Sequence, residues 1–400
     1  MSFQFLNVAS LFEGCDSIRN LTVNETFIFQ SPNYSYTNLN KRYEAGSSCR
    51  LQLIAPQGYF IRLSGRISLD RKPSVFTCIG QGQKFLVSRD GMNDFYYADI
   101  FCSIDTISID SISNEMTIGY ISDKDGSGRY QVFAKAMKMT KENCDCGWSY
   151  YSFTKQYSST LFKGFTSVVG IYNIDNDEIV CTGTIISSKY VLTAAHCVQP
   201  VSNPTSTLNI IVGYRIYPSD DYPQYQANYA IDSVKIHEKY SGISPSQVND
   251  IALLKTASNI KFSRGVSPIC LPSTKIFGDE EYYKIKYDLV AWSKYNNDGL
   301  EQKLLNASVS SFTNLNCVSS FKKFNLASNQ LCTFMKNTSV SYPELPGAVL
   351  IYTLNDRKCL VGLFNLKVEH TQPVVYTRVS AFIQWIKDSI AGEFLCNKFY

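Results

Sequence analysis

Thirteen cysteines, spread over all 400 residues, are the strongest constraint on how this chain folds. So many thiols are uncommon in cytosolic proteins, where reducing conditions prevent lasting disulfides. We therefore expect a disulfide-containing protein that is secreted and extracellular. Zinc is the competing explanation, but three histidines and one close cysteine pair, Cys144 and Cys146, do not supply two pairs of ligands. We predict no metal and no cofactor.

Five sequons for N-linked glycosylation favour a secretory route. The acceptor residues are Asn20, Asn24, Asn33, Asn306 and Asn337. The first ten residues contain no basic residue and only a short apolar stretch, which is not typical of a whole signal peptide. Either the leader is missing from this sequence or the protein is exported by another route.

Length and composition exclude several classes of protein. Four hundred residues predict two or three domains, and 44% hydrophobic against 18% charged residues exclude a disordered chain. No apolar run approaches the ~20 residues needed to cross a bilayer. The net charge of +4 is not gathered into a basic tract. We therefore expect neither a membrane nor nucleic acid as a partner.

Residues 15–138 show a strand pattern. Ile61, Leu63, Ile67 and Leu69 alternate with arginines and serines, and period two is typical of a strand with one buried face. Turn sequences rich in Pro, Gly, Asn and Asp separate the segments. The pattern predicts an antiparallel β-sandwich.

The same region resembles a CUB domain. The resemblance is carried by Cys15, Ser31–Tyr34, Cys49, Ala55–Gly58, Cys78 and Cys102. In that family the cysteines pair consecutively, which implies the disulfides Cys15–Cys49 and Cys78–Cys102. Many CUB domains bind calcium through an acidic residue soon after the third cysteine, but none follows Cys78. Asp70 alone supplies too few oxygen ligands, so we expect it to be a solvated residue.

A polar, cysteine-containing segment at 139–148 follows, and after it the chain again has short strand patterns. One helix is predicted near the end. Phe382, Ile386 and Ile390 recur every four residues, with Trp385 alongside, so residues 381–390 present one apolar stripe.

Two short motifs carry the chemistry. His196 lies in Val191-Leu-Thr-Ala-Ala-His-Cys197, and Asp250 lies in Asn249-Asp-Ile-Ala-Leu-Leu-Lys255. In this order they resemble the trypsin-like (S1, chymotrypsin-fold) serine proteases, whose chain order is His, Asp, Ser. Further matches are Cys181 and Cys197, Pro268–Pro272, Cys317 and Cys332, and Val375–Val379.

The resemblance covers about residues 149–393. It implies an all-β chain, with a CUB β-sandwich before a double six-stranded antiparallel β-barrel and a C-terminal helix. The implied organisation is a CUB domain at 15–138, a linker at 139–148, a protease-homologue domain at 149–393 and a tail at 394–400.

The linker resembles the one in CUB-serine proteases of insect venom and saliva, notably from predatory bugs. In those proteins the cysteine before the linker glycine is tethered to the protease domain. The resemblance implies three further disulfides, Cys146–Cys270, Cys181–Cys197 and Cys317–Cys332.

The resemblance also assigns roles. His196 corresponds to the general base and Asp250 to its buried orienting partner. The family's Gly-Asp-Ser-Gly-Gly-Pro corresponds to residues 343–348, which places Leu345 at the nucleophile position. A leucine side chain has no lone pair to attack with and no proton to lose, so covalent acyl transfer cannot begin. A buried His–Asp pair can instead be structural, with its hydrogen bonds satisfied.

The oxyanion site is altered as well. Pro343 occupies a position whose backbone N–H would help bind the oxyanion, and proline has no N–H. The family's activation sequence, Arg-Ile-Val-Gly-Gly, does not occur, and the corresponding position is 154–157. Glu344 therefore keeps a carboxylate without an evident partner, and a solvated loop charge is the simpler account.

The specificity pocket departs from the family too. Ser339 stands where a basic-residue-selecting aspartate would be, and Val374 replaces a pocket glycine. The cysteine pair that braces the pocket is missing, with Ser341 in one of its places. We expect a narrowed or filled pocket.

Three cysteines, Cys144, Cys359 and Cys396, remain without an assigned partner. Because three is odd, at least one must be unpaired or linked between chains. We expect Cys396, in the tail, to be the most accessible. A monomer is expected, with a disulfide-linked dimer as the alternative.

The sequence favours a secreted, catalytically inactive serine protease homologue that binds a protein partner or target. One rival is an active endopeptidase that uses a displaced serine, Ser339 or Ser341. Another is a venom or salivary filler protein without a specific target.

Overall fold

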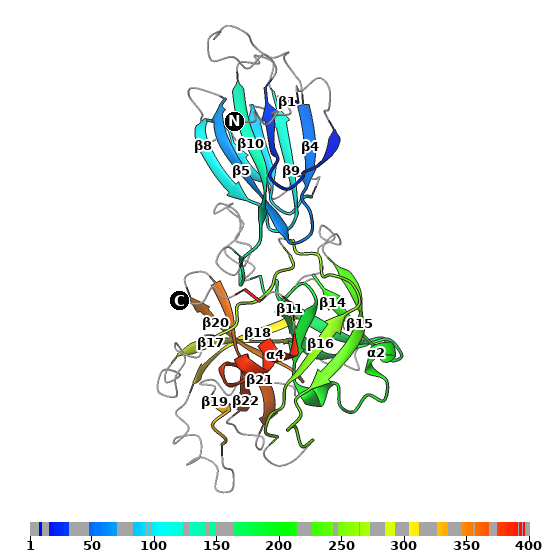
Figure 1. Ribbon diagram of the computed structural model, residues 1–400. Helices are drawn as coiled ribbons and strands as arrows, with labels where there is room; N and C mark the ends of the chain where they lie inside the picture. The colour runs from blue at the N-terminus through cyan, green and yellow to red at the C-terminus, as the bar shows by residue number, and fades with distance from the viewer. Residues whose placement is uncertain are drawn as a thin grey trace. The chain divides into compact units, whose positions relative to one another are not determined.

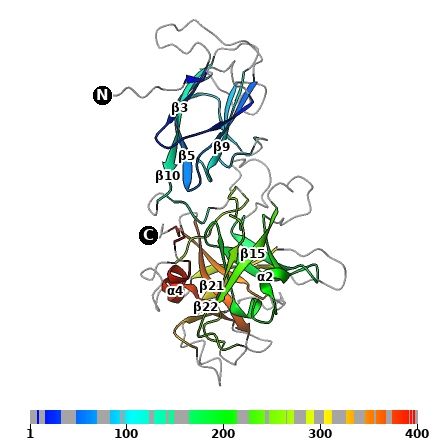
Figure 2. The same ribbon diagram turned by 45° about the vertical axis from the view of Figure 1, so that its right-hand side comes forward.

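The computed structural model describes residues 8–9, 16–31, 48–69, 83–92, 95, 98–122, 128–140, 144–148, 164–213, 226–242, 247–263, 265–272, 285–292, 304–311, 326–334, 346–354, 357–367, 374–390, 392–393 and 395–396. The chain divides into two compact units, Met1–Thr140 and Lys141–Tyr400. The first is blue to cyan and the second mainly green to red in Figures 1 and 2. The division falls within the linker predicted at 139–148.

The first unit consists of two five-stranded sheets, called here sheet A and sheet B. Sheet A has the order β1 (Val8–Ala9), β3 (Thr26–Gln30), β10 (Arg129–Lys138), β5 (Tyr59–Ser68), β8 (Ile104–Asp110). Sheet B has the order β2 (Ser17–Asn20), β4 (Ser48–Ile54), β9 (Glu115–Ile121), β6 (Lys84–Ser88), β7 (Asp99–Phe101). The predicted β-sandwich is therefore present.

Alternation along each strand builds the core between the sheets. In β5, Ile61, Leu63 and Ile67 are fully buried while the residues between them are more exposed, as the period-two pattern predicts. Aromatic rings fill the centre around Tyr130, whose ring centroid lies 5.2 Å from that of Phe29. The rings of Phe85 and Tyr120 lie 5.0 and 5.1 Å from that of Tyr130. These contacts hold the two sheets together.

Two cysteines of this unit, Cys49 and Cys102, are disulfide-bonded. Their implied partners, Cys15 and Cys78, lie outside the described residues, so both pairings stay predictions. Asp70 also lies outside them.

The second unit contains two closed barrels of six antiparallel strands each, as the resemblance implies (Figure 1). The first barrel has the order β11 (Val168–Asn173), β12 (Glu178–Ile185), β13 (Tyr190–Thr193), β16 (Ala252–Thr256), β15 (Ala227–Ile236), β14 (Leu208–Val212). The second has the order β17 (Lys286–Trp292), β18 (Leu304–Ser311), β19 (Gln330–Phe334), β22 (Val374–Arg378), β21 (Arg357–Lys367), β20 (Val349–Leu354).

The two barrels share one hydrophobic cluster. Leu192 and Leu253 of the first barrel belong to it together with Val290, Val349 and Leu363 of the second. Because these side chains are almost fully buried, the barrels form one packed body rather than two independent modules.

The chain ends in the helix that the sequence predicts. A 3₁₀ turn, Val379–Phe382, leads into α4, Ile383–Ser389. Phe382, Ile386 and Ile390 are buried, which confirms the apolar stripe. The α-helix begins at Ile383 rather than 381, because the tighter turn comes first. The other α-helix described, α2, is the short Pro204–Thr207. No helix among the described residues has the length and apolarity to span a bilayer.

The segment 144–148 is fixed to the second unit by two disulfides. Cys146 is bonded to Cys270, as the resemblance implies, and Cys144 is bonded to Cys396. The expectation that Cys396 is accessible was therefore wrong, since the tail returns to the end of the linker. Gly147 adds backbone hydrogen bonds to Pro268 and Lys358.

Cys359, on β21, is the one free cysteine among the described residues, and it is buried. Burial raises the pKa of its thiol well above the usual value, so it stays a protonated, unreactive group. The cysteine on which a disulfide-linked dimer depended, Cys396, is paired within the chain.

Gly147 is the position in this segment where only glycine fits. Its φ is +66°, and a Cβ there would lie 2.7 Å from the backbone nitrogen of Lys358 and 2.9 Å from Sγ of Cys270. We predict that Gly147→Ala lowers the free energy of unfolding by about 3 kcal/mol, through backbone strain and the clash together.

The matched control is Gly392→Ala. Gly392 has φ +84° but open space around the Cβ position, so only the backbone strain of about 1 kcal/mol applies. Chemical denaturation of both full-length variants measures the difference, and an equal loss in the two contradicts the account of the clash.

His237 joins β15 to the terminal helix. Its ring centroid lies 5.3 Å from that of Phe382 and 5.1 Å from that of Trp385. Its Nδ1 accepts the backbone N–H of Lys239 at 3.1 Å, which requires the neutral imidazole. Burial lowers the pKa of His237 below its usual value, Glu238 opposes this, and Lys239 and Lys235 add to it.

A histidine with a lowered pKa makes folding depend on pH. In the unfolded chain His237 takes up a proton near pH 6.5, while in the folded protein it stays neutral. The contribution of His237 to the free energy of unfolding is therefore present above that pH and is lost as the pH falls. We predict that His237→Phe, which keeps an aromatic ring, gives a shallower loss of unfolding free energy between about pH 7 and 5. Denaturation at several pH values measures the slope, and an unchanged slope is the contrary result.

Candidate functional site

The pairing of two strands brings His196 and Asp250 together. β13 and β16 are antiparallel neighbours in which Thr193 lies opposite Ala252. The end of β13 and the start of β16 therefore meet at one edge of the barrel. His196 follows in the 3₁₀ turn Ala195–Cys197, and Asp250 lies two residues before β16. The structure thus places the two predicted residues side by side.

The Asp250 carboxylate holds His196 by two hydrogen bonds. The backbone N–H of His196 donates to Oδ1 at 2.9 Å, and the imidazole Nδ1 lies 2.6 Å from Oδ2. The Asp250 side chain is fully buried, whereas the His196 side chain is 16% exposed. Asp250 therefore fixes the Nδ1 edge of the ring in the interior, and the His196 side chain as a whole keeps a small exposed fraction.

This contact selects the tautomer of the imidazole. A carboxylate can only accept, so Nδ1 carries a proton, and in the neutral form of the imidazole Nε2 keeps its lone pair. Nε2 is the atom that takes the nucleophile's proton in a catalytic triad. No hydroxyl of the described residues forms a hydrogen bond with it.

Side chains from the second barrel hold the segment before Asp250. The hydroxyl of Thr377 on β22 donates to the backbone carbonyl of Asp250 at 2.9 Å. The amide of Asn365 on β21 donates to the carbonyl of Gln247 at 2.6 Å and to the Thr377 hydroxyl at 3.2 Å. The bonds to Asp250 and Gln247 cross between the barrels, so the pair depends on the barrels packing correctly.

A third tie runs through Asn249, which has a positive φ of 61°. Its side-chain carbonyl accepts the Asn329 amide at 2.8 Å, and its own amide donates to the Lys239 carbonyl at 3.0 Å. Asparagine tolerates this backbone conformation better than most residues. No pattern in the sequence predicted Thr377, Asn365 or Asn329 as parts of the site. Thr377 lies within the recognised motif 375–379, which was the one available signal.

Large apolar side chains stand next to the imidazole. The ring of Phe364 is edge-on to His196, with centroids 6.5 Å apart, and also edge-on to Tyr376 at 6.3 Å. Val374 packs beside them on the core of the second barrel. The prediction that Val374 narrows the pocket is compatible with this packing and stays a prediction.

The chain just after the nucleophile position is anchored beside His196. The backbone N–H of Thr182 donates to the Pro346 carbonyl at 3.1 Å. Gly347 has φ +71°, and a Cβ there would lie 3.0 Å from Sγ of Cys197, the residue after His196. Pro346 and Gly347 therefore lie close to the loop that carries His196.

Five residues of the predicted site lie outside the described residues. They are Ser339, Ser341, Pro343, Glu344 and Leu345. Their roles stay predictions from the sequence.

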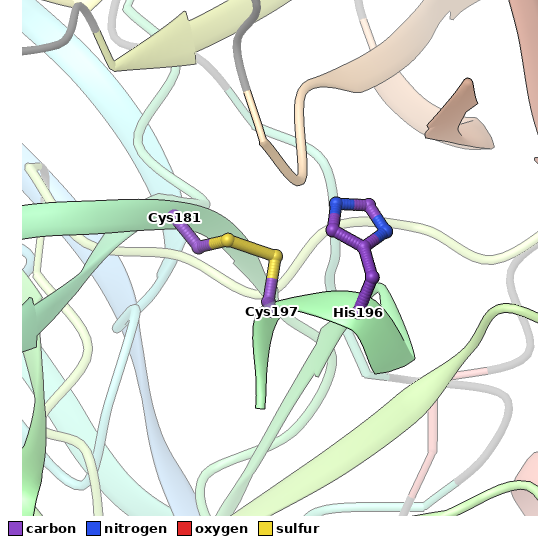
Figure 3. Close-up of side chains that lie close together, drawn as sticks. All are labelled: Cys181, His196 and Cys197. Atoms are coloured by element: carbon purple, nitrogen blue, oxygen red, sulfur yellow. A yellow bond between two sulfur atoms is a disulfide. The ribbon is translucent and has the colours of Figure 1, made fainter. Parts of the chain in front are cut away.

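His196 also lies next to the disulfide of its loop. Possible ligand atoms of Cys181, His196 and Cys197 all lie within 4.8 Å of one another, a spacing that could suit a metal ion. Cys181 and Cys197 are bonded to each other, as predicted (Figure 3). Because metal binding needs free thiolates, one imidazole remains as a ligand, and the cluster does not make a metal site.

Tyr240 has a phenol group close enough to Asp250 to be affected by its charge. Burial, assisted by the negative charge of Asp250, raises its pKa to about 12. It therefore stays protonated at neutral pH and cannot act as a general base there.

Other predicted sites are placed as follows. Asn20, Asn24 and Asn306 are exposed, as glycan acceptors must be, whereas Asn33 and Asn337 lie outside the described residues. Cys332 is disulfide-bonded, and its implied partner Cys317 also lies outside them, so that pairing stays a prediction.

The hydrogen bonds of Asp250 predict its contribution to stability. Asp250→Ala leaves the backbone N–H and Nδ1–H of His196 without acceptors in the interior, so we expect the free energy of unfolding to fall by about 2–4 kcal/mol. In Asp250→Asn the side-chain oxygen can still accept the backbone N–H of His196, and the new NH2 group can donate to Nδ1 of the other His196 tautomer. We therefore expect the free energy of unfolding to fall by only about 1 kcal/mol. Chemical denaturation checks both values, and an Asp250→Ala variant as stable as the parent contradicts a structural role.

Comparisons with known proteins agree with this geometry. The Trypsin family matches residues 163–386. Venom serine protease 34 of Apis mellifera is 27% identical over 94% of this chain and 87% of its own length. The venom serine protease of Polistes dominula is 28% identical over 65% of this chain and 93% of its own length. Serine protease grass of Drosophila melanogaster is 26% identical over 67% of this chain and 76% of its own length. The chain belongs to the Trypsin family of serine proteases.

Proposed function

We propose that this protein is a secreted, catalytically inactive serine protease homologue that acts by binding a protein partner. The observation that carries the proposal is Leu345 at the position of the nucleophile. A hydroxyl must lie within hydrogen-bond reach of Nε2 of the base for attack on a carbonyl. Leucine cannot meet that requirement.

The sequence also argues against a working oxyanion site and against a replacement nucleophile. Pro343 lacks the N–H that its position would aim at the oxyanion, and one such donor is worth about 10²–10³ in rate. The described residues contribute no substitute hydroxyl at Nε2 of His196. A displaced serine would need base, donors and substrate to align around it, which the loop sequence does not favour.

The His–Asp pair has a role without chemistry. Its two hydrogen bonds, together with Thr377 and Asn365, join the barrels through buried polar contacts. A rigid double barrel of this kind can present surface loops for recognition. Binding by those loops is the function we propose for the second unit.

Extracellular location is part of the proposal. Three disulfides are described in the second unit, and such bonds persist in oxidising compartments. Two of the similar proteins are venom proteases by name. We assign the first unit to the CUB family on its cysteine pattern and its two-sheet fold.

Restoring the nucleophile alone tests the proposal. We predict that Leu345→Ser does not hydrolyse peptide substrates above the level of a blank, because Pro343 and the altered activation sequence remain. The measurement uses full-length protein purified free of other hydrolases, with a mock purification as control. Robust turnover by Leu345→Ser refutes the oxyanion part of the argument, and turnover by the parent protein refutes inactivity.

Binding needs its own experiment. The immobilised full-length protein should repeatedly recover the same protein from haemolymph, and a heat-unfolded sample should not. Repeated recovery of nothing favours the filler-protein alternative instead.

A further inference from the structure

Strand alternation places several basic residues on the outer face of sheet A of the first unit, together with the buried Ile28 and Phe60 and the half-buried Phe133. On β5, Ile61, Leu63 and Ile67 point into the core, so Arg62 and Arg66 point outward. On β10, Tyr130, Val132 and Ala134 are in the core, so Arg129 and Lys135 point outward on the same side. These four residues, Arg62, Arg66, Arg129 and Lys135, are called here the basic face.

The basic face does not follow from the charge of the whole unit. Residues 1–140 contain 14 Lys and Arg against 13 Asp and Glu. On the outer side of β3, β10, β5 and β8, the strand residues that the structure describes include four basic residues and a single acid, Asp110. The outer side of sheet B is more balanced, with Arg50 and Lys84 against Glu115. Positive charge is therefore gathered on one side of the sandwich.

This arrangement works against stability. Lys135 lies directly opposite Arg62 in the antiparallel register, and like charges in that position repel. Asp110 offsets part of this through two hydrogen bonds to Arg62, of 2.7 and 2.8 Å. Arg66 and Lys135 are exposed, and neither forms an ion pair with any residue that the structure describes. An anion on this face would relieve the repulsion.

We propose that the basic face of sheet A binds a sulfated polysaccharide. The guanidinium fork of arginine matches the oxygens of a sulfate group in geometry and charge. Arg62 and Arg66 are four residues apart on one strand, so they are about 13 Å apart. Arg66, and the N–H groups of Arg62 that Asp110 does not engage, can contact successive anionic groups along an extended polymer. Ser64 of β5 lies between them, Ser108 of β8 lies opposite Ser64, and Thr106 of β8 lies opposite Arg66, so three hydroxyl side chains line the same stretch.

The face is less suited to other polyanionic or membrane partners. Ile104, at the edge, is the one strongly exposed large apolar side chain among its described residues. A protein interface needs a buried apolar centre, and membrane docking needs apolar side chains that insert. A basic, hydroxyl-bearing face whose other large apolar residues, Ile28, Phe60 and Phe133, are buried or half-buried fits a hydrated sulfated chain better.

The proposal is independent of the second unit. It uses no residue of the His–Asp site, so it holds or fails whether or not the protein is an enzyme.

Heparin binding by the full-length protein tests it. We expect retention on immobilised heparin at about 0.15 M salt and weaker binding as salt rises. The double variant Arg66→Thr/Lys135→Thr removes two charges with a residue that suits strands. It should bind about tenfold or more weakly, and the slope of log K against log salt should fall in magnitude by about 2.

The matched control is Arg50→Thr/Lys84→Thr, which removes the same charge from the outer side of sheet B. It should bind heparin like the parent protein, and both variants should unfold like the parent. Three results overturn the proposal: no retention of the parent protein, an equal loss in the control, or equal binding of desulfated heparin. Stronger binding of polyglutamate or of phosphatidylserine vesicles than of heparin would assign the face to an acidic protein or a membrane and also overturn it.

Discussion

A buried carboxylate, that of Asp250, is the constraint on which the second unit depends. A charge without solvent exposure is tolerated only when its oxygens are satisfied. Both of its oxygens receive hydrogen bonds from His196, and Thr377 of the other barrel binds its backbone carbonyl. The pair is therefore useful to the fold itself. The junction therefore serves the fold whether or not the chain carries out the chemistry.

The His–Asp junction is connected to the segment 144–148 through Cys270 and strand β21. Cys270, bonded to Cys146, takes part in backbone hydrogen bonds with Lys358 and Leu360 of β21. β21 continues to Phe364 and Asn365 at the site. The segment 144–148, the second barrel and the His–Asp pair thus form one connected structure. Residues of the linker become part of the protease-like body.

The sequence predicted most of the architecture because its patterns are local. Period two in 61–69 identified a strand, and the spacing of Phe382, Ile386 and Ile390 identified the helix. The barrels were implied by the resemblance of the His and Asp motifs to the trypsin-like family. The sequence did not predict Cys144–Cys396, because a pairing of residues 252 positions apart is set by where the tail packs. The bonds of Asn365 and Asn329 were missed for the same reason. Each joins segments that become neighbours only when both barrels have formed.

We propose that this scaffold has lost the group that attacks a carbonyl. Labelling of the intact protein with a fluorophosphonate probe, before and after treatment with trypsin, tests it most directly, because the probe reports any serine activated by a neighbouring base. We expect the protein to stay unlabelled under both conditions, so that its mass does not change. Stoichiometric labelling of one serine, abolished in a His196→Ala variant, would show that a working nucleophile exists and would contradict the account.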